Sequence, residues 1–517
     1  MTTTLDPAQA QTQPQSADRS VIQLSDPAGA DRRGTLALGL LVSAQFMVML
    51  DTSIVNVALP SLQSDLGLGP AGVAWVVNAY VLAFGGLLVL SGRVADLFGR
   101  RRMFIGGSAL FTLGTLLAAA ASNQWMLLGG RVLQGAGAAA LSPAAMSLLL
   151  LTFPGPARAR AMSLWGAASA VGGATGVFLG GFLTGAFGWQ AVFLVTVPVS
   201  VTGVVLARRV LEEPAHGIRH RFDALGAVSI TGAVVALVHG ALGLAENGIA
   251  TATVVSLAAA AALVGAFIAV ECRAAEPLVP LDLLGSRVVS TGVGLAVLGG
   301  SARASTFVLV ALFLQQALGF DPQHAGLAMV PTSVSGFIVS LTLLPRALRV
   351  FGPRLTLVTG MVVLAAGHLW LAYAPTGAGY AVAVLPGLLL VATGVAFSFT
   401  PTTMVIAGAM PDVHAGLASG LAGSATQIGS ALGTSVFTAV GLAVAGTAAG
   451  TLGPSGFTAA FTAAAGVSLA TAALGCTLLR RPWTSIPRDH QGTSHRLQPA
   501  MRVPRTSGNR STSSSRD

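Results

Sequence analysis

The stretch Met49-Leu50-Asp51-Thr52-Ser53-Ile54-Val55-Asn56-Val57-Ala58-Leu59-Pro60 places one carboxylate, that of Asp51, inside a strongly apolar run. Across Leu36–Leu59 the other strongly polar side chains are Gln45 and Asn56, and the run is long enough to cross a bilayer. A charge at that depth costs about 2.5–3.5 kcal/mol on insertion scales, so a chain that keeps one usually turns it toward water or a partner. The alternative is that Asp51 snorkels to the outer interface, although its side chain is short and about 12 Å of helix separates it from Leu59. Asp51 is therefore the first functional candidate.

The composition is typical of an integral membrane protein. Of the 517 residues, 53% are hydrophobic and only 9% are charged, too few to cover the surface of a soluble protein of this size. The two cysteines, Cys272 and Cys476, lie far apart, and the sequence indicates neither a disulfide framework nor a metal site. The first 34 residues lack the order of a signal peptide, so we expect the first apolar segment to be retained.

Fourteen apolar segments of spanning length follow one another along the chain. They are Leu36–Leu59, Val73–Leu90, Met103–Ala121, Trp125–Thr152, Ala161–Leu183, Ala191–Ala207, Ala224–Ala245, Ile249–Val270, Val288–Gln316, Ala325–Leu344, Leu355–Tyr373, Tyr380–Ala407, Ala415–Ala445 and Gly456–Leu479. We therefore predict an all-α integral membrane protein with fourteen transmembrane helices.

The arginines predict the orientation of these helices. With the amino terminus inside, outward links such as Ser61–Gly72, Gly185–Gln190 and Gly446–Pro454 contain no Arg, whereas the inward links and tails are rich in it. Only Arg131 and Arg303 fall inside predicted spans. By the positive-inside rule, we expect a multi-pass protein of the plasma membrane with both termini in the cytoplasm.

An internal repeat divides the chain. The segment Gly92–Arg101 aligns with Pro345–Arg354 at an offset of 253, and Leu66–Pro70 resembles Leu318–Pro322 at an offset of 252. Two parallel six-helix bundles with an inserted helix pair account for both offsets, and such repeats are typical of transporters with a substrate site between the halves. The expected parts are an amino-terminal disordered tail (1–34), the first bundle (35–210), a linker with the extra pair (211–287), the second bundle (288–480) and a basic disordered tail (481–517).

Arg131 is the natural partner for Asp51. It lies about six residues into a helix that enters from the outer side, so the two charges are expected at nearly equal depth. An Arg beside a carboxylate keeps it ionised, and loss of that contact favours protonation. A conformational change that moves the pair would therefore bind or release a proton, unless the two form a static ion pair that only orients helices.

Two further motifs are built around glycine. The loop after the second helix holds an acid among bases at tight-turn spacing, which favours a gating hinge over a simple topology signal. Its residues are Gly92, Asp96, Gly99, Arg100 and Arg101. In the fifth helix, Gly172, Gly176, Gly180 and Gly181 form a face that lets another helix approach closely, with or without a role in gating.

These motifs together resemble the major facilitator superfamily, in particular its fourteen-helix drug:proton antiporter branch. The Leu50–Pro60 stretch is similar to that branch's first-helix motif, Gly92–Arg101 to the superfamily's loop motif and Arg131–Gly137 to its fourth-helix proton-transfer motif. The resemblance implies that Asp51 and Arg131 couple transport to protons and that Asp96 and Arg100 form part of the cytoplasmic gate. Two departures exist: Val177 stands where the fifth-helix motif usually has Pro, and Ala425-Thr426-Gln427 lacks the acid that some multidrug relatives carry.

The sequence thus predicts a secondary transporter that exports amphipathic small molecules in exchange for protons, without a cofactor, a metal or nucleic acid, as a monomer in the lipid bilayer. A proton-coupled importer or facilitator of a small metabolite is the alternative, and a non-transporting membrane sensor is a third reading. An enzyme is not indicated, because no catalytic constellation lies at matched depth.

The substrate itself is not specified by the sequence. Polar side chains in the spans become cavity candidates if they face inward. These candidates are Gln45, Asn56, Gln134, Arg303 and Gln316. Arg303 lies in mid-span with no acid expected near its depth, which suggests contact with an anionic or phenolic substrate, helix packing or interface snorkelling.

Overall fold

The computed structural model describes residues 27–213, 223–247, 250–274, 277–374, 379–445 and 452–478, and every regular element within these ranges is a helix. The described helices all belong to one contact unit. The predicted tails lie outside the described residues, except that 27–34 already form the start of the first helix. The all-α class is confirmed.

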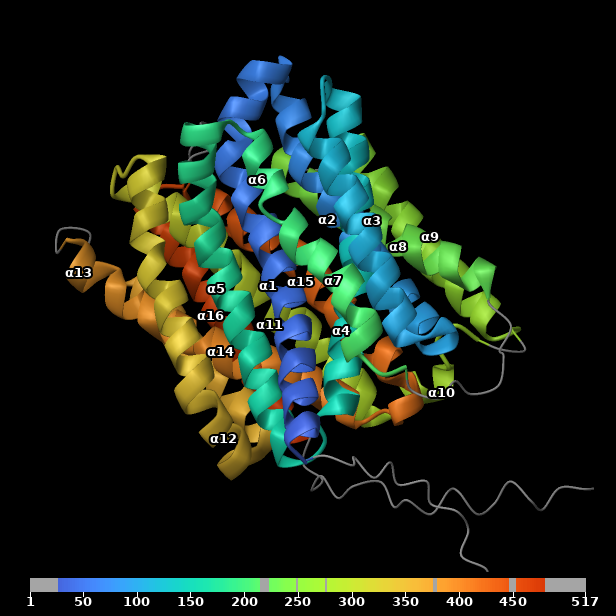
Figure 1. The fold of residues 1–517 in the computed structure, drawn as a ribbon. Coiled ribbons are helices and arrows are strands. Elements are labelled where there is room, and N and C mark those ends of the chain that lie inside the picture. Colours follow the sequence, from blue (N-terminus) through green and yellow to red (C-terminus); the bar gives the residue numbers. More distant parts are fainter. Residues whose placement is uncertain are drawn as a thin grey trace, which may run out of the picture. The chain divides into compact units, whose positions relative to one another are not determined.

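The elements follow the predicted segments closely, and Figure 1 colours them in chain order. They are α1 (Pro27–Leu66), α2 (Pro70–Phe98), α3 (Arg100–Ala119), α4 (Gln124–Thr152), α5 (Pro156–Phe187), α6 (Gln190–Leu194), α7 (Val197–Val210), α8 (Ala224–Asn247), α9 (Thr251–Glu271), α10 (Leu281–Gly285), α11 (Arg287–Leu312), the π-helical turn η1 (Phe313–Ala317), α12 (Pro322–Ala372), α13 (Tyr380–Ala383), α14 (Leu385–Gly408), the 3₁₀ turn η2 (Asp412–His414), α15 (Ala415–Ala445) and α16 (Pro454–Leu478).

The number of spans differs from the prediction. Twelve helical segments of the described residues are long and apolar enough to cross a membrane, or thirteen if the bent pair Ala157–Gly173 and Phe178–Phe187 is one span. The main difference lies in α12, which has 51 residues. As one rod it would extend about 76 Å, more than twice the thickness of a bilayer's hydrocarbon core. Gly352 interrupts it with φ 72° and ψ 172°. Fourteen spans, with two of them meeting at Gly352, therefore remain a prediction.

The internal repeat has a direct structural counterpart in two pairs of glycines. Gly99 ends α2 with φ 110°, and its repeat equivalent Gly352 breaks α12 with φ 72°. Gly67 and Gly319, the second pair, have φ values of 62° and 68°. Positive φ is readily adopted only by glycine, so the sequence keeps this residue where each half must turn its chain.

The arginine two residues after Gly99 and the one two residues after Gly352 make equivalent contacts. Arg101 donates from Nη1 to the carbonyl of Leu211, just beyond α7, at 3.2 Å. Arg354 donates from Nη2 to the carbonyl of Cys476 in α16, at 2.6 Å. In each half, therefore, the second turn is fastened to the end of that half's last helix.

Two large apolar cores support a division into halves. One consists of buried residues between Ala37 and Leu211, and another of buried residues between Ala302 and Ala472. The extra pair α8 and α9 lies side by side, and α8 packs against both α2 and α15. The domain boundaries remain a prediction that these cores favour.

Candidate functional site

Asp51 and Arg131 meet in the interior of the first half. Arg131 donates from Nη1 to Oδ2 of Asp51 at 2.9 Å, and the two residues are 1% and 0% exposed. The equal depth inferred from the sequence thus corresponds to a direct contact between α1 and α4. A buried pair of this kind persists only with close geometry and further hydrogen bonds, because both charges have left water.

Gln134 supplies those further bonds. Its Nε2 donates to Oδ1 of Asp51 at 3.1 Å and to Oγ1 of Thr115 at 2.9 Å, while its Oε1 accepts from Arg131 Nη1 at 3.0 Å. The side chain lies one turn beyond Arg131 on α4 and is fully buried. Gln134 was a candidate for the substrate cavity, but both ends of its amide are engaged within the charge cluster.

The second helix completes the surroundings of Arg131. Its Nε donates to the carbonyl of Val76 at 3.1 Å, and its guanidinium carbon lies 4.4 Å from the ring centroid of Tyr80. A cation over an aromatic face is attracted by the ring's quadrupole, most strongly where water is excluded. Tyr80 and Thr115 were not among the residues predicted from the sequence.

Four helices therefore converge on one ion pair. We call Asp51, Tyr80, Thr115, Arg131 and Gln134 the charge cluster; they come from α1, α2, α3 and α4. Each oxygen of the carboxylate accepts one hydrogen bond, from Arg131 or from Gln134. Chemically, such a carboxylate can alternate between an ionised, paired form and a protonated form if the helices shift.

The glycine face of α5 packs on α1 beside this cluster. A Cβ at Gly172 would lie 2.6 Å from the carbonyl oxygen of Phe46, and one at Gly176 would lie 2.9 Å from that of Leu50. At Gly180 the carbonyl of Ile54 would be 2.9 Å away. The three glycines thus bring the backbones of α1 and α5 into contact over two turns, and Leu50 directly precedes Asp51. Gly181 lies at the edge of this face, 3.9 Å from Val57 by the same measure.

The fifth helix bends without proline. The segments Ala157–Gly173 and Phe178–Phe187 make an angle of 43°. Val177 stands where the motif usually has Pro, so the lack of proline does not remove the bend. The bend lies next to Gly173 and Gly176, and glycine is a common site of helix bending.

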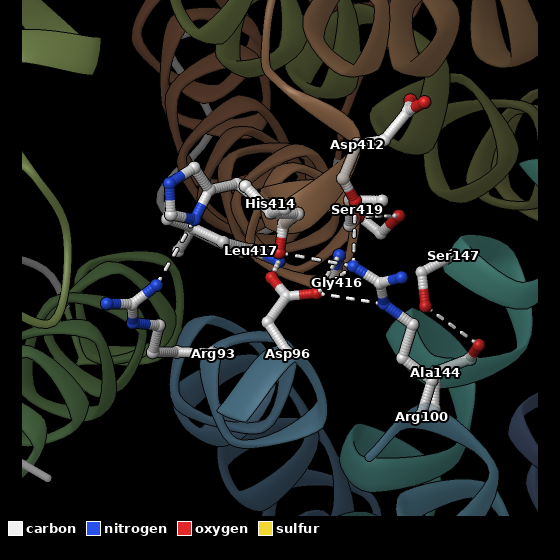
Figure 2. Close-up of polar contacts among 12 residues, drawn as sticks. Arg93, Asp96, Arg100, Ala144, Ser147, Asp412, His414, Gly416, Leu417 and Ser419 are labelled. Atoms are coloured by element: carbon white, nitrogen blue, oxygen red, sulfur yellow. Dashed lines mark hydrogen bonds and ion pairs between the residues drawn. The ribbon is translucent and has the colours of Figure 1, made fainter. Parts of the chain in front are cut away.

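The loop motif connects the two halves at the end of α2. Asp96 accepts hydrogen bonds from the backbone N–H groups of Gly416 and Leu417, at 2.9 and 2.8 Å, at the first turn of α15 (Figure 2). A carboxylate at a helix amino terminus satisfies unpaired N–H groups and the helix dipole together. The side chain of Asp96 thus joins the end of α2 to the start of α15, some 320 positions further along the chain.

Two arginines extend this connection. Arg100 bonds to Oδ1 of Asp96 at 2.8 Å and reaches across to the carbonyls of Asp412 and Val413, at 2.8 and 3.1 Å. Arg93 lies on the other side of Asp96 and contacts Nδ1 of His414 at 3.2 Å (Figure 2). Arg101, by contrast, binds within its own half at the end of α7.

Glycine permits the close crossing of α2 and α15. A Cβ at Gly92 would lie 2.9 Å from the carbonyl carbon of Gly416, and one at Gly416 would lie 2.7 Å from Oδ1 of Asp96. A Cβ at Gly420 would be 3.3 Å from the Cα of Gly92. The helices thus meet backbone to backbone, and we call this contact with Asp96 and Arg100 the α2–α15 lock.

Three cavity candidates have different surroundings. Gln45 is buried and donates from Nε2 to Ser169 on α5 at 2.8 Å. Asn56 is exposed and bonds within its own helix to the carbonyl of Thr52. Gln316 accepts from the backbone N–H of Leu452 at 3.0 Å, which favours a structural role beside the link before α16.

Arg303 lies in a different environment from Arg131. It is 4% exposed, and neither Nη1 nor Nη2 has a hydrogen-bond partner among the described residues. Its guanidinium carbon lies 5.8 Å from the ring centroid of Phe399 on α14. The described residues contain no group of three or more His, Cys, Asp or Glu placed to hold a metal ion.

Known sequences match most of this chain. A family model described as Major Facilitator Superfamily matches residues 41–434. The cephamycin export protein of Amycolatopsis lactamdurans is 38% identical over 75% of this chain and 81% of its own length. The puromycin resistance protein of Streptomyces alboniger is 35% identical (76% and 79% covered), and the lincomycin resistance protein of Streptomyces lincolnensis is 32% identical (77% and 82% covered).

Solved structures share the fold at low sequence identity. The human organic anion transporter MFSD10 superposes with a TM-score of 0.61 at 15% identity, covering 86% of this chain and 99% of its own. The proton:xylose symporter XylE gives 0.62 at 16% identity, with 86% and 95% covered. At this identity the likeness concerns the fold alone.

Proposed function

Because this chain belongs to the major facilitator superfamily and its relatives are named for antibiotic export and resistance, we propose that it is a drug exporter driven by the proton gradient. It is a transporter and not an enzyme. Its substrates are amphipathic small molecules, taken from the cytoplasmic side and released outside by alternating access.

The single observation that carries the proton coupling is the buried contact between Asp51 and Arg131. An acid and a base that are almost completely withdrawn from water can exchange a proton with the solvent only when the helices rearrange. Substrate exchange needs the same rearrangement of the two halves. One group therefore carries a proton inward for each outward movement of substrate, and no nucleotide or other cofactor is required.

The energetics of this exchange are adequate. One proton charge moving through 100 mV is worth about 2.3 kcal/mol, which sustains roughly a 50-fold gradient of a neutral substrate. The α2–α15 lock supports the alternating-access step, because it joins the two halves at one end of the helix bundle. When the halves move apart there, the hydrogen bonds of Asp96 to α15 break together. In the proposed orientation, the two termini and this lock lie on the cytoplasmic side of the plasma membrane, and one chain suffices for transport.

Inverted membrane vesicles test the direction of transport. In vesicles with an acidic lumen, an exporter of this kind accumulates substrate, so puromycin and lincomycin form the first panel because relatives carry their names. We expect uptake that nigericin abolishes by collapsing the pH gradient. Accumulation only under the opposite gradient would instead establish an importer, and uptake indifferent to nigericin would exclude coupling to pH.

A further inference from the structure

Arg303 has a charge that the described protein does not neutralise. Its side chain is 4% exposed, and both terminal nitrogens lack hydrogen-bond partners among the described residues. Burying a guanidinium without a partner is costly, whereas Arg131 in the first half has a carboxylate, an amide and a carbonyl. Burial of this guanidinium becomes favourable when a bound molecule provides the missing hydrogen-bond acceptors.

The second half has no carboxylate within its membrane-spanning helices that could pair with Arg303. Between Arg287 and Leu478 the acidic residues are Asp321 and Asp412. Both are exposed, Asp321 beyond the end of α11 and Asp412 beyond the end of α14. Among the described residues, the core of the second half therefore has one buried guanidinium, that of Arg303, and the α-helices of this half contain no acidic residue.

The repeat gives the depth of Arg303. A Cβ at Gly433 of α15 would lie 2.5 Å from the carbonyl of Ser301, just as one at Gly176 of α5 meets that of Leu50. At the offset of 253 that relates the two halves, Arg303 corresponds to Leu50, which directly precedes Asp51. Arg303 therefore lies at the level of Asp51, on the opposite half.

The surroundings of Arg303 are shaped for a planar group. Its guanidinium lies over Phe399, and it folds back along α11 over Gly299, where a Cβ would be 2.6 Å from Nη1. The next residue of α14, Thr400, is also buried, and its hydroxyl lacks a partner among the described residues. Thr400 faces α5, because a Cβ at Gly166 would lie 2.8 Å from its Oγ1. This stretch of α14 thus contacts helices of both halves.

We propose that Arg303, positioned over Phe399 by Gly299, binds the anionic group of the transported molecule, and that the chain accepts amphipathic aromatic carboxylates. A carboxylate matches the guanidinium fork and receives two parallel hydrogen bonds. Phe399 contributes an aromatic surface beside the charge. This inference rests on the proposed export function for its biological meaning, but binding at Arg303 is measurable without any transport.

The test compares two probes of nearly the same shape, of which one carries a negative charge and the other is neutral. Purified protein in nanodiscs is titrated with 1-pyrenebutyrate or with 1-pyrenebutanamide, and energy transfer from tryptophan to pyrene reports binding after subtraction of empty discs. We expect the wild type to prefer the carboxylate, and Arg303→Gln to weaken carboxylate binding about tenfold, as for loss of a charged hydrogen bond, while amide binding stays within about twofold.

Three further variants make the result specific. Arg303→Lys should recover part of the carboxylate preference, and Gly299→Ala should weaken it with the charge retained, because the new methyl group displaces the guanidinium. Arg287→Gln, an exposed arginine at the start of the same helix, is the matched control and should change nothing. Equal loss for both probes in Arg303→Gln, or no preference in the wild type, would overturn the proposal. Loss of proton coupling in Asp51→Asn would leave it intact.

Discussion

Asp96 at the end of α2 accepts a hydrogen bond of 2.8 Å from the backbone N–H of Leu417 at the start of α15. The contact joins the two halves through a side chain on one and a helix terminus on the other. Its strength depends on the negative charge, since the positive end of the helix dipole attracts it. The α2–α15 lock should therefore weaken when a substitution removes the charge of Asp96 but keeps the shape of its side chain.

Asp96→Asn should open this end of the transporter. The amide replaces one of the two acceptor oxygens by an NH2 group and has no charge for Arg100 or the helix terminus, so the closed form loses about 1–2 kcal/mol. Spin labels at the exposed positions Phe98 and Val413, in a background without Cys272 and Cys476, measure the distance between the two ends. Asp412→Asn is the control, because only its backbone carbonyl contacts Arg100. An unchanged distance distribution in Asp96→Asn would show that the lock does not hold the helices together.

Gly92→Ala should act at the same place by sterics. The added Cβ would meet the backbone of Gly416, which cannot move aside as a side chain can, and overpacking of this kind costs about 1–3 kcal/mol. We expect a strong decrease of export at normal expression. Gly106→Ala on α3, where a Cβ meets nothing within 4 Å, is the matched control. Full activity of Gly92→Ala would contradict the close crossing.

Gly176→Ala should disturb α1 next to Asp51. Its Cβ would lie 2.9 Å from the carbonyl of Leu50, whereas a Cβ at Gly173, three residues earlier on α5, has open space. Export and its dependence on the pH gradient should both fall in Gly176→Ala and remain in Gly173→Ala. Equal behaviour of the two variants would argue that the glycine face has no influence on the charge cluster.

Tyr80→Leu should weaken the charge cluster more than Tyr80→Phe. The ring face lies 4.4 Å from the guanidinium carbon of Arg131, and such a contact is worth up to about 2 kcal/mol when water is excluded. Phenylalanine keeps the face, so thermal unfolding in detergent should be near that of the wild type. Leucine should lower the unfolding temperature and the rate of proton-coupled export. If both variants match the wild type, the aromatic face contributes nothing.

Gln134→Leu should be more damaging than its polar character alone suggests. It removes the amide that joins Asp51, Thr115 and Arg131, and each buried group left without a partner costs about 1–3 kcal/mol. The expected result is a lower unfolding temperature with loss of proton-coupled export. Gln63→Ala, an exposed residue at the end of α1, serves as the control. Normal coupling in Gln134→Leu would exclude the amide from the coupling site.

Much of this organisation was predictable because it rests on strong local patterns. Apolar runs gave the helices, and the rarity of intramembrane charges identified Asp51 and Arg131 as a pair. The span count was harder, since a single glycine with positive φ decides whether α12 is one helix or two. Length and composition alone do not distinguish these cases.

The partners across helices were not predictable. Tyr80 and Thr115 lie on helices whose neighbours depend on packing, and nothing in their local sequence indicates which side faces Arg131. The partner of Asp96 is backbone N–H, which any residue provides, so no motif on α15 marks it. Gln134 and Gln316 were grouped as polar cavity candidates, whereas their neighbours assign them to hydrogen-bond networks.

Transport by the Asp51→Asn variant shows whether this carboxylate carries the proton. The variant and the wild type are reconstituted into proteoliposomes, and a labelled substrate is followed in two modes: accumulation driven by a pH gradient, and exchange against unlabelled substrate without a gradient. We predict that Asp51→Asn loses the gradient-driven accumulation and retains exchange. The amide fits beside Arg131 and Gln134, but it does not bind and release a proton as a carboxylate does. Accumulation at the wild-type rate, still abolished by nigericin, would contradict the assignment of Asp51 as the proton carrier.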